Sequence, residues 1–203
     1  MDFYTTDVIK CGGKNALVGM TTTEVNDQAL KPLTYYRQVS YCGKLNDLPG
    51  SGVGPAEVFI SHAWKYKFLD VVEALQNHLR GEPNAIIWFD LFSNNQHCTP
   101  DLDFNWWSSA FKGAIETIGR TVIARTPRNN PLPLKRPWCL LGFYCTIGTR
   151  RRFEVAMSEI EYDEFIRDVS DDCGVVDQMI EDVCTRNSEA GKADEKVKIL
   201  ILL

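Results

Sequence analysis

The sequence predicts a three-layer α/β fold with a central, mostly parallel sheet. Four short, mainly apolar runs are bounded by polar or turn residues: Val58–Ile60, Ala85–Phe89, Arg120–Ala124 and Arg152–Ala156. The first two are continuous apolar runs, which are typical of strands that are buried on both faces, as in parallel sheets. Segments with helical spacing of apolar residues separate the runs, and this alternation implies right-handed crossover connections.

Three helices are expected between the predicted strands, over residues 66–79, 105–118 and 138–147. In the first, Phe68, Val71 and Leu75 recur at the spacing that places side chains on one helix face. Gly81 follows this segment, as glycine often does at the end of a helix. Each helix would cover one face of the sheet.

A segment rich in glycine and proline, Pro49–Pro55, marks the predicted domain boundary. We expect residues 1–54 to form an N-terminal helical extension and linker, and residues 55–203 to form the α/β domain. Within the extension, Thr23–Glu24 predicts the start of a short helix, and the rough apolar stripe over residues 33–45 predicts a second one.

The chain becomes acidic beyond Ser158, where Phe165, Val169, Val176 and Ile180 are expected on helices that cover one face of the sheet. The apolar ending Val197–Leu203 is interpreted as a last strand or a helix. An alternative interpretation of this ending is that the chain is a piece of a longer protein.

Composition narrows the class of protein. The chain has 203 residues, a formal net charge of −5 and a pI near 5.3. A negative surface disfavours nucleic acid as a partner, because binding phosphates needs positive charge. The basic run Arg150–Arg152 is the local exception, and we interpret it as a solvated turn in preference to an anion site.

The spacing of the cysteines and histidines fits neither a disulfide framework nor a metal-binding motif. Seven cysteines without a Cys-x-x-Cys pair favour reduced thiols and a cytoplasmic location. No apolar run is long enough to span a membrane, so we expect no membrane span. His62, His78 and His97 lie far apart without a shared motif, and we therefore expect no metal site.

Polar side chains follow the first two predicted strands. Ser61 and His62 end the first, and Asp90 ends the second. Ligands of open α/β sheets bind at the carboxyl ends of strands, so these residues and Trp64 are candidates for binding a substrate. The alternatives are a loop-start hydrogen bond for Ser61, core packing for Trp64 and capping of the loop for Asp90.

The segment Leu91–Asp103 is polar and long for a connection, which favours a functional loop. Asn95 and His97 lie in it and are further candidate binding residues. Hydrogen bonding within the loop is the competing interpretation. Ser61 and His62 are adjacent, so their side chains should diverge on a strand, which argues against a serine–histidine nucleophilic pair.

Residues 55–158 resemble the TIR-like (Toll/interleukin receptor-like) domain found in large proteins of algae, oomycetes and other protists. The matching segments are Val58–Asp70, which contains Phe-Ile-Ser-His-Ala-Trp, Trp88–His97, Arg136–Cys139 and Phe153–Ser158. The resemblance implies a flavodoxin-like fold, association between TIR domains and, in catalytic relatives, cleavage of NAD⁺ at the nicotinamide–ribose bond. It also implies that the loop carrying Asn95 and His97 takes part in self-association and gates the pocket.

The family's catalytic glutamate stands three residues after the Trp-Cys pair, a position that Gly142 occupies here. We therefore expect a TIR-like signalling and assembly module with impaired catalysis, whose partners are itself or other TIR domains. The alternative is an NAD⁺ glycohydrolase, with NAD⁺ as substrate or ligand and no resident cofactor. A phosphoacceptor receiver using Asp90 is disfavoured, because Ser61 and His62 stand where receivers need an acidic pair for magnesium.

Overall fold

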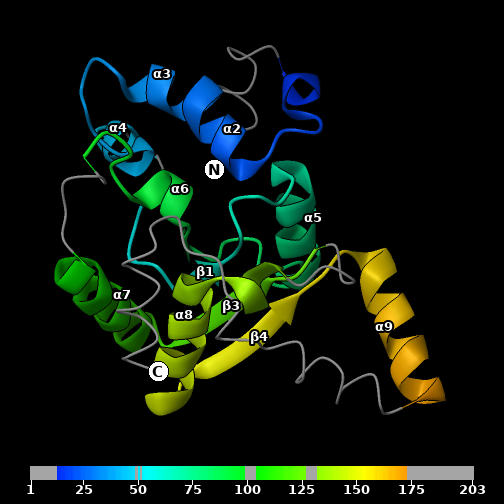
Figure 1. The fold of residues 1–203 in the computed structure, drawn as a ribbon. Coiled ribbons are helices and arrows are strands. Elements are labelled where there is room, and N and C mark those ends of the chain that lie inside the picture. Colours follow the sequence, from blue (N-terminus) through cyan, green and yellow to red (C-terminus); the bar gives the residue numbers. More distant parts are fainter. Residues whose placement is uncertain (1–12, 49, 51, 99–103, 127–131, 173–203) are drawn as a thin grey trace.

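A four-stranded, all-parallel sheet organises the protein (Figure 1). The computed structural model describes residues 13–48, 50, 52–98, 104–126 and 132–172. The strands, with the spatial order β2-β1-β3-β4, are β1 (Val58–Ser61), β2 (Ile87–Trp88), β3 (Arg120–Ala124) and β4 (Arg152–Ala156). The predicted α/β class and parallel sheet are thereby confirmed, and such a sheet is consistent with a flavodoxin-like fold.

Helices connect the strands as the alternation predicts. They are α5 (Phe68–His78), α6 (Asp90–Ser93), α7 (Phe104–Ile118), the 3₁₀ turn Leu132–Lys135 and α8 (Pro137–Gly148), and α9 (Glu159–Asp171) follows β4. Ser158 caps α9, since its side chain accepts a hydrogen bond from the Glu161 amide. None of the described helices is both long and apolar enough to cross a bilayer.

Two hydrophobic clusters lie on opposite faces of the sheet. Val58 and Ile60 of β1 belong to the cluster that contains the buried face of α5. Phe59, which points to the other face, packs with Ile115 of α7 and Leu141 of α8. The Phe59 ring also stacks on Trp88, with centroids 4.5 Å apart and planes 8° apart. The sheet is therefore the middle layer of three.

The N-terminal residues join the α5 side of this core. Their elements are a 3₁₀ turn (Lys14–Leu17), α2 (Thr22–Val25), a π-helix (Asn26–Leu30), α3 (Lys31–Thr34) and α4 (Tyr41–Asn46). The predicted short helix at Thr23–Glu24 is present as α2, opened by a capping box between Thr21 and Glu24. Val25 and Leu30 are buried in the same cluster as β1 and α5.

The predicted single helix over residues 33–45 is wrong. Helix α3 ends at Thr34, and Gln38 adopts a positive φ of 48°, which no helix tolerates. A new helix, α4, then begins after Ser40, whose hydroxyl accepts a hydrogen bond from the Gly43 amide. The apolar stripe that suggested one helix belongs to two short ones.

Two further boundaries differ from the prediction. The second strand is Ile87–Trp88 rather than 85–89, because the Ala85 amide closes a turn on the Glu82 carbonyl. The predicted loop 91–103 begins inside α6, and its residues 99–103 lie outside the described residues. Phe165 and Val169 lie on α9 as a helix was predicted there, but no residue of α9 is buried. The predictions for Val176, Ile180 and residues 197–203 fall outside the described part of the chain.

Candidate functional site

Asp90 is the centre of the polar cluster at the carboxyl ends of β1 and β2. Its Oδ2 accepts a hydrogen bond of 2.6 Å from the indole Nε1 of Trp64. Its Oδ1 accepts one of 2.8 Å from the Leu91 amide, in the first turn of α6. Trp64 packs partly buried against the core. The carboxylate thus ties the loop after β1 to the loop after β2.

His62 is enclosed next to this carboxylate. Its side chain is 1% exposed, and its ring stacks on Phe89 with centroids 4.6 Å apart. Burial lowers the pKa of His62, and the negative charge of Asp90, whose Oδ1 lies 3.7 Å from Nδ1, opposes that shift. The imidazole is therefore neutral at neutral pH. Its Nε2 has no hydrogen-bond partner among the described residues.

Ser61 and His62 diverge, as expected for neighbours at the end of a strand. The Ser61 side chain hydrogen-bonds to Cys139 of α8, whereas His62 faces Phe89. The Cys139 thiol also donates to the His62 carbonyl over 3.6 Å. Burial raises the pKa of Cys139 to about 11, so the sulfur is a protonated thiol and a poor nucleophile. The structure thus uses Ser61 to pack α8 against β1.

Gly142 lies one helical turn beyond Cys139 and faces α7. A Cβ atom at this position would stand 3.3 Å from Cε1 of Phe111 and 4.0 Å from Cδ1 of Ile115. A side chain at residue 142 would therefore enter the contact between α7 and α8. The sequence alone gave no sign of this neighbour, because the two helices meet only in the folded chain.

Asn95 and His97 lie on a loop that side-chain hydrogen bonds fasten to the N-terminal helices. Asn95 Nδ2 donates to the Gln38 carbonyl over 2.7 Å, and its Oδ1 accepts from the His97 amide over 3.0 Å. His97 Nε2 lies 2.9 Å from the hydroxyl of Thr34. Because that hydroxyl donates its own hydrogen to the Leu30 carbonyl, His97 Nε2 must be the donor.

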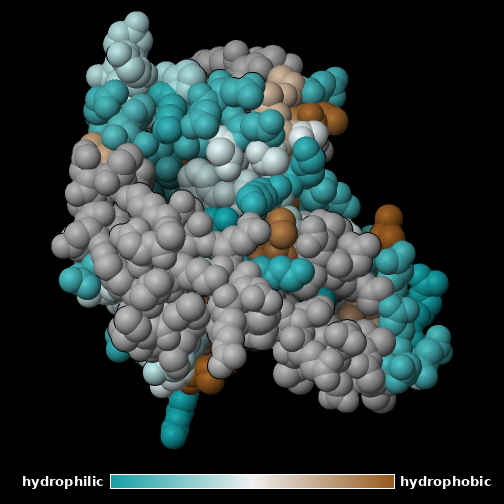
Figure 2. All heavy atoms as spheres, viewed as in Figure 1, coloured by the Kyte–Doolittle hydropathy of each residue, from teal (hydrophilic) through white to brown (hydrophobic). Residues whose placement is uncertain are grey.

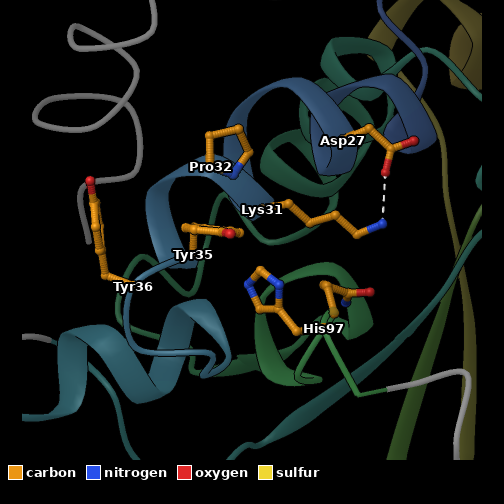
Figure 3. Close-up of a pocket in the computed structure, with 7 residues that line it drawn as sticks. Asp27, Lys31, Pro32, Tyr35, Tyr36 and His97 are labelled. Atoms are coloured by element: carbon orange, nitrogen blue, oxygen red, sulfur yellow. Dashed lines mark hydrogen bonds and ion pairs between the residues drawn. The ribbon is translucent and has the colours of Figure 1, made fainter.

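A hollow of about 710 Å³ lies between this loop and the N-terminal helices (Figure 3). Its lining residues are Asp27, Lys31, Pro32, Tyr35, Tyr36, Gln96 and His97. In Figure 3 the Lys31 side chain extends over the His97 ring toward Asp27, while Tyr36 lies at the outer end. Of these residues, Gln96 and His97 lie in the loop that the sequence marked as a functional candidate, and His97 was a predicted binding residue. No local pattern signals a site assembled from segments some 60 residues apart in the chain.

The predicted site residues therefore fall into three places. Ser61, His62, Trp64 and Asp90 come together, Asn95 and His97 lie at the hollow, and Gly142 packs under α7. Within the described ranges, no group of three His, Cys, Asp or Glu side chains is placed to hold a metal ion. Comparisons with protein-family models, curated proteins and solved structures find no match for this chain.

Proposed function

We propose that the chain is a TIR-like signalling and assembly module that associates with itself or with other TIR domains, without cleaving NAD⁺. The observation that carries the proposal is the fastened loop after α6. Hydrogen bonds from Asn95 and His97 hold it against residues 34–38, beside Tyr35 and Tyr36, which are 64% and 97% exposed. A surface held in one conformation loses less entropy when a partner binds.

Exposed tyrosines favour a protein partner. Tyrosine is enriched in protein–protein contacts because it offers a large, rigid ring and a polar hydroxyl. On the face seen in Figure 2, hydrophilic side chains cover much of the upper part, where the N-terminal helices lie. Aromatic side chains surrounded by polar ones are typical of non-obligate contacts.

The polar cluster offers little for NAD⁺ cleavage. Breaking the nicotinamide–ribose bond creates an oxocarbenium-like centre that an aimed carboxylate would stabilise. Both oxygens of Asp90 already accept hydrogen bonds, from Trp64 and Leu91. Gly142 supplies no carboxylate at the position where the family resemblance expects one. Losing such a group costs on the order of 10²- to 10⁴-fold in rate.

Light scattering across a concentration series tests the assembly proposal. We expect the mean mass of the native chain to rise with concentration, and His97→Ala to reduce this rise by releasing the loop from Thr34. His78→Ala is the matched control, because His78 pairs with Glu154 at the contact between α5 and β4. A native chain that stays monomeric at every concentration would refute self-association.

One observation favours the second candidate, an NAD⁺ glycohydrolase. His62 Nε2 is buried without a partner among the described residues, close to the Asp90 carboxylate. A bound ligand with a hydrogen-bond donor would satisfy it. Measuring NAD⁺ consumption by the native chain and by His62→Phe separates the candidates. Turnover that His62→Phe abolishes supports the enzyme, and background turnover in both supports the assembly module.

A further inference from the structure

The hollow beside His97 presents hydrogen-bond acceptors that have no partner among the described residues. Gln96 Nε2 donates to the carbonyls of Asp90 and Leu91, at 2.8 and 3.2 Å, which leaves its Oε1 as an acceptor. His97 carries its hydrogen on Nε2, so Nδ1 is an acceptor too. Asp27 uses Oδ1 for Lys31 at 3.0 Å, and its Oδ2 makes no hydrogen bond within the described part of the chain.

Aromatic rings form the outer side of the hollow. Tyr35 and Tyr36 meet edge to face, with centroids 5.9 Å apart and planes at 78°. Tyr35 lies next to Lys31 and His97 in Figure 3. The ammonium of Lys31 is paired with Asp27, so the hollow carries no excess positive charge. A ring face beside several acceptors is the environment that a planar cation with many N–H donors prefers, and a guanidinium is such a group.

The chain itself displays a guanidinium on a rigid turn. Arg150 adopts a φ of 55°, and its amide and that of Arg151 donate to Ile147 and Thr146 over 3.0 and 2.9 Å. The side chain of Arg150 is exposed, and no ion pair involves it among the described residues. Non-glycine residues seldom adopt this φ, because the side chain crowds the backbone. Within the described molecule, no hydrogen bond or ion pair uses the Arg150 side chain.

We propose that the hollow of one copy binds the guanidinium of Arg150 of a second copy. The ring of Tyr35 would stack on the guanidinium, and Asp27 and Gln96 would accept its hydrogen bonds. Lys31, 41% exposed, would turn outward from Asp27. The turn between α8 and β4 lies at the opposite end of the molecule from α3 (Figure 1), so the contact joins two different surfaces.

A contact between two different surfaces repeats from copy to copy and gives an open head-to-tail chain rather than a closed dimer. This inference rests on the proposed self-association and specifies its surfaces. It also gives a role to the basic run Arg150–Arg152, for which an ordinary solvated turn was the sequence-based interpretation.

Two complementary variants test the pairing. Arg150→Asn removes the guanidinium with a residue that tolerates positive φ, and Tyr35→Ala removes the stacking ring. We expect each variant alone to associate about tenfold more weakly than the native chain. An equimolar mixture should form dimers, because the intact turn of the Tyr35→Ala copy fits the intact hollow of the Arg150→Asn copy, and should grow no further.

Controls use matched exposed residues. Arg80→Asn removes an arginine whose side chain is 75% exposed, and Tyr162→Ala removes a tyrosine that is 52% exposed. Both should associate like the native chain. Arg150→Lys keeps the positive charge but lacks the planar guanidinium with its forked N–H donors. It should therefore associate as weakly as Arg150→Asn. Sedimentation velocity measures all of these species, and circular dichroism verifies that each is folded.

The outcomes separate this inference from the proposed function. A native chain that remains monomeric overturns both. A native chain that associates, with Arg150→Asn and Tyr35→Ala associating equally well, overturns the pairing and leaves the assembly function standing. Weak association of both variants without recovery in the mixture points to a contact between identical surfaces and also overturns the pairing.

Discussion

Placing a glutamate at residue 142 is the most informative substitution, because it restores the acid that the family resemblance expects. The fold directs a side chain at this position toward α7. Gly142 is buried, and its Cβ would meet the Phe111 ring at 3.3 Å. That ring is itself wedged against Phe59 and Trp138, at 4.9 and 6.0 Å between centroids, and has little freedom to withdraw.

Three effects set the magnitude for Gly142→Glu. Overpacking a filled core costs about 1–3 kcal/mol. Burying a carboxyl group without a partner costs about 1–3 kcal/mol more, and replacing glycine within a helix returns about 1 kcal/mol. We expect a loss of about 1–5 kcal/mol in the free energy of unfolding, which lowers the urea midpoint by about 0.5–2.5 M for an m-value of about 2 kcal/mol/M.

Urea unfolding followed by tryptophan fluorescence measures this loss. Gly113→Glu is the matched control, since a Cβ at Gly113 of α7 has no atom within 4 Å. It should be neutral or slightly stabilising, because glutamate favours a helix over glycine. A Gly142→Glu protein that is as stable as the native chain and that cleaves NAD⁺ would refute this reasoning.

Three further predictions concern single groups. Burial lowers the pKa of His62 below 6.5, so the unfolded chain binds more protons than the folded chain below that pH. The urea midpoint should therefore fall on acidification below about pH 6.5, and His62→Phe should flatten this pH dependence. A variant whose urea midpoint depends on pH as steeply as that of the native chain would contradict the prediction. Burial raises the pKa of Glu154, but hydrogen bonds from Arg120 and His78 outweigh burial and hold the pKa below 4.5. The stability that Glu154 contributes should be lost as the pH falls below 4.5, and Glu154→Gln should lower the free energy of unfolding by about 1–3 kcal/mol at neutral pH. A variant as stable as the native chain would show that these hydrogen bonds do not stabilise the fold. Iodoacetamide followed by peptide mass spectrometry should label the exposed Cys98 in the native state and leave Cys139 unlabelled until urea is added, and early labelling of Cys139 would show that α8 opens.

The sequence predicted the elements whose signal is local. Residues 120–124 and 152–156 are strands over the expected ranges. Val122–Ala124 is a short apolar run that Arg125 and Thr126 end, and Phe153 and Val155 alternate with polar residues. The region from Asn26 to Asn46 was not predictable in the same way. Pro32 has no amide hydrogen to continue a regular helix, and the preceding turn is a π-helix. Ser40 then caps a new helix inside what sequence spacing suggested was one.

The candidate site also has parts that the sequence predicted and parts that it did not. That Asp90 lies beside the end of β1 followed from the rule that neighbouring parallel strands end at one edge, whereas its contact with His62 was not predicted. The hydrogen bond from Trp64 to Asp90 did not follow, because it depends on a side-chain direction within a loop. The hollow was also not predictable, since it needs the turn at Gln38 and the amide of Asn95 to bring distant segments together.

One experiment on the native chain tests both assembly and the absence of NAD⁺ cleavage. NAD⁺ is added to a concentration series, and each sample is examined by sedimentation velocity and then assayed for remaining NAD⁺. We expect the mean mass to rise with protein concentration while NAD⁺ stays at the level of the protein-free blank. NAD⁺ that disappears in proportion to the protein, while the protein remains monomeric throughout, would contradict it.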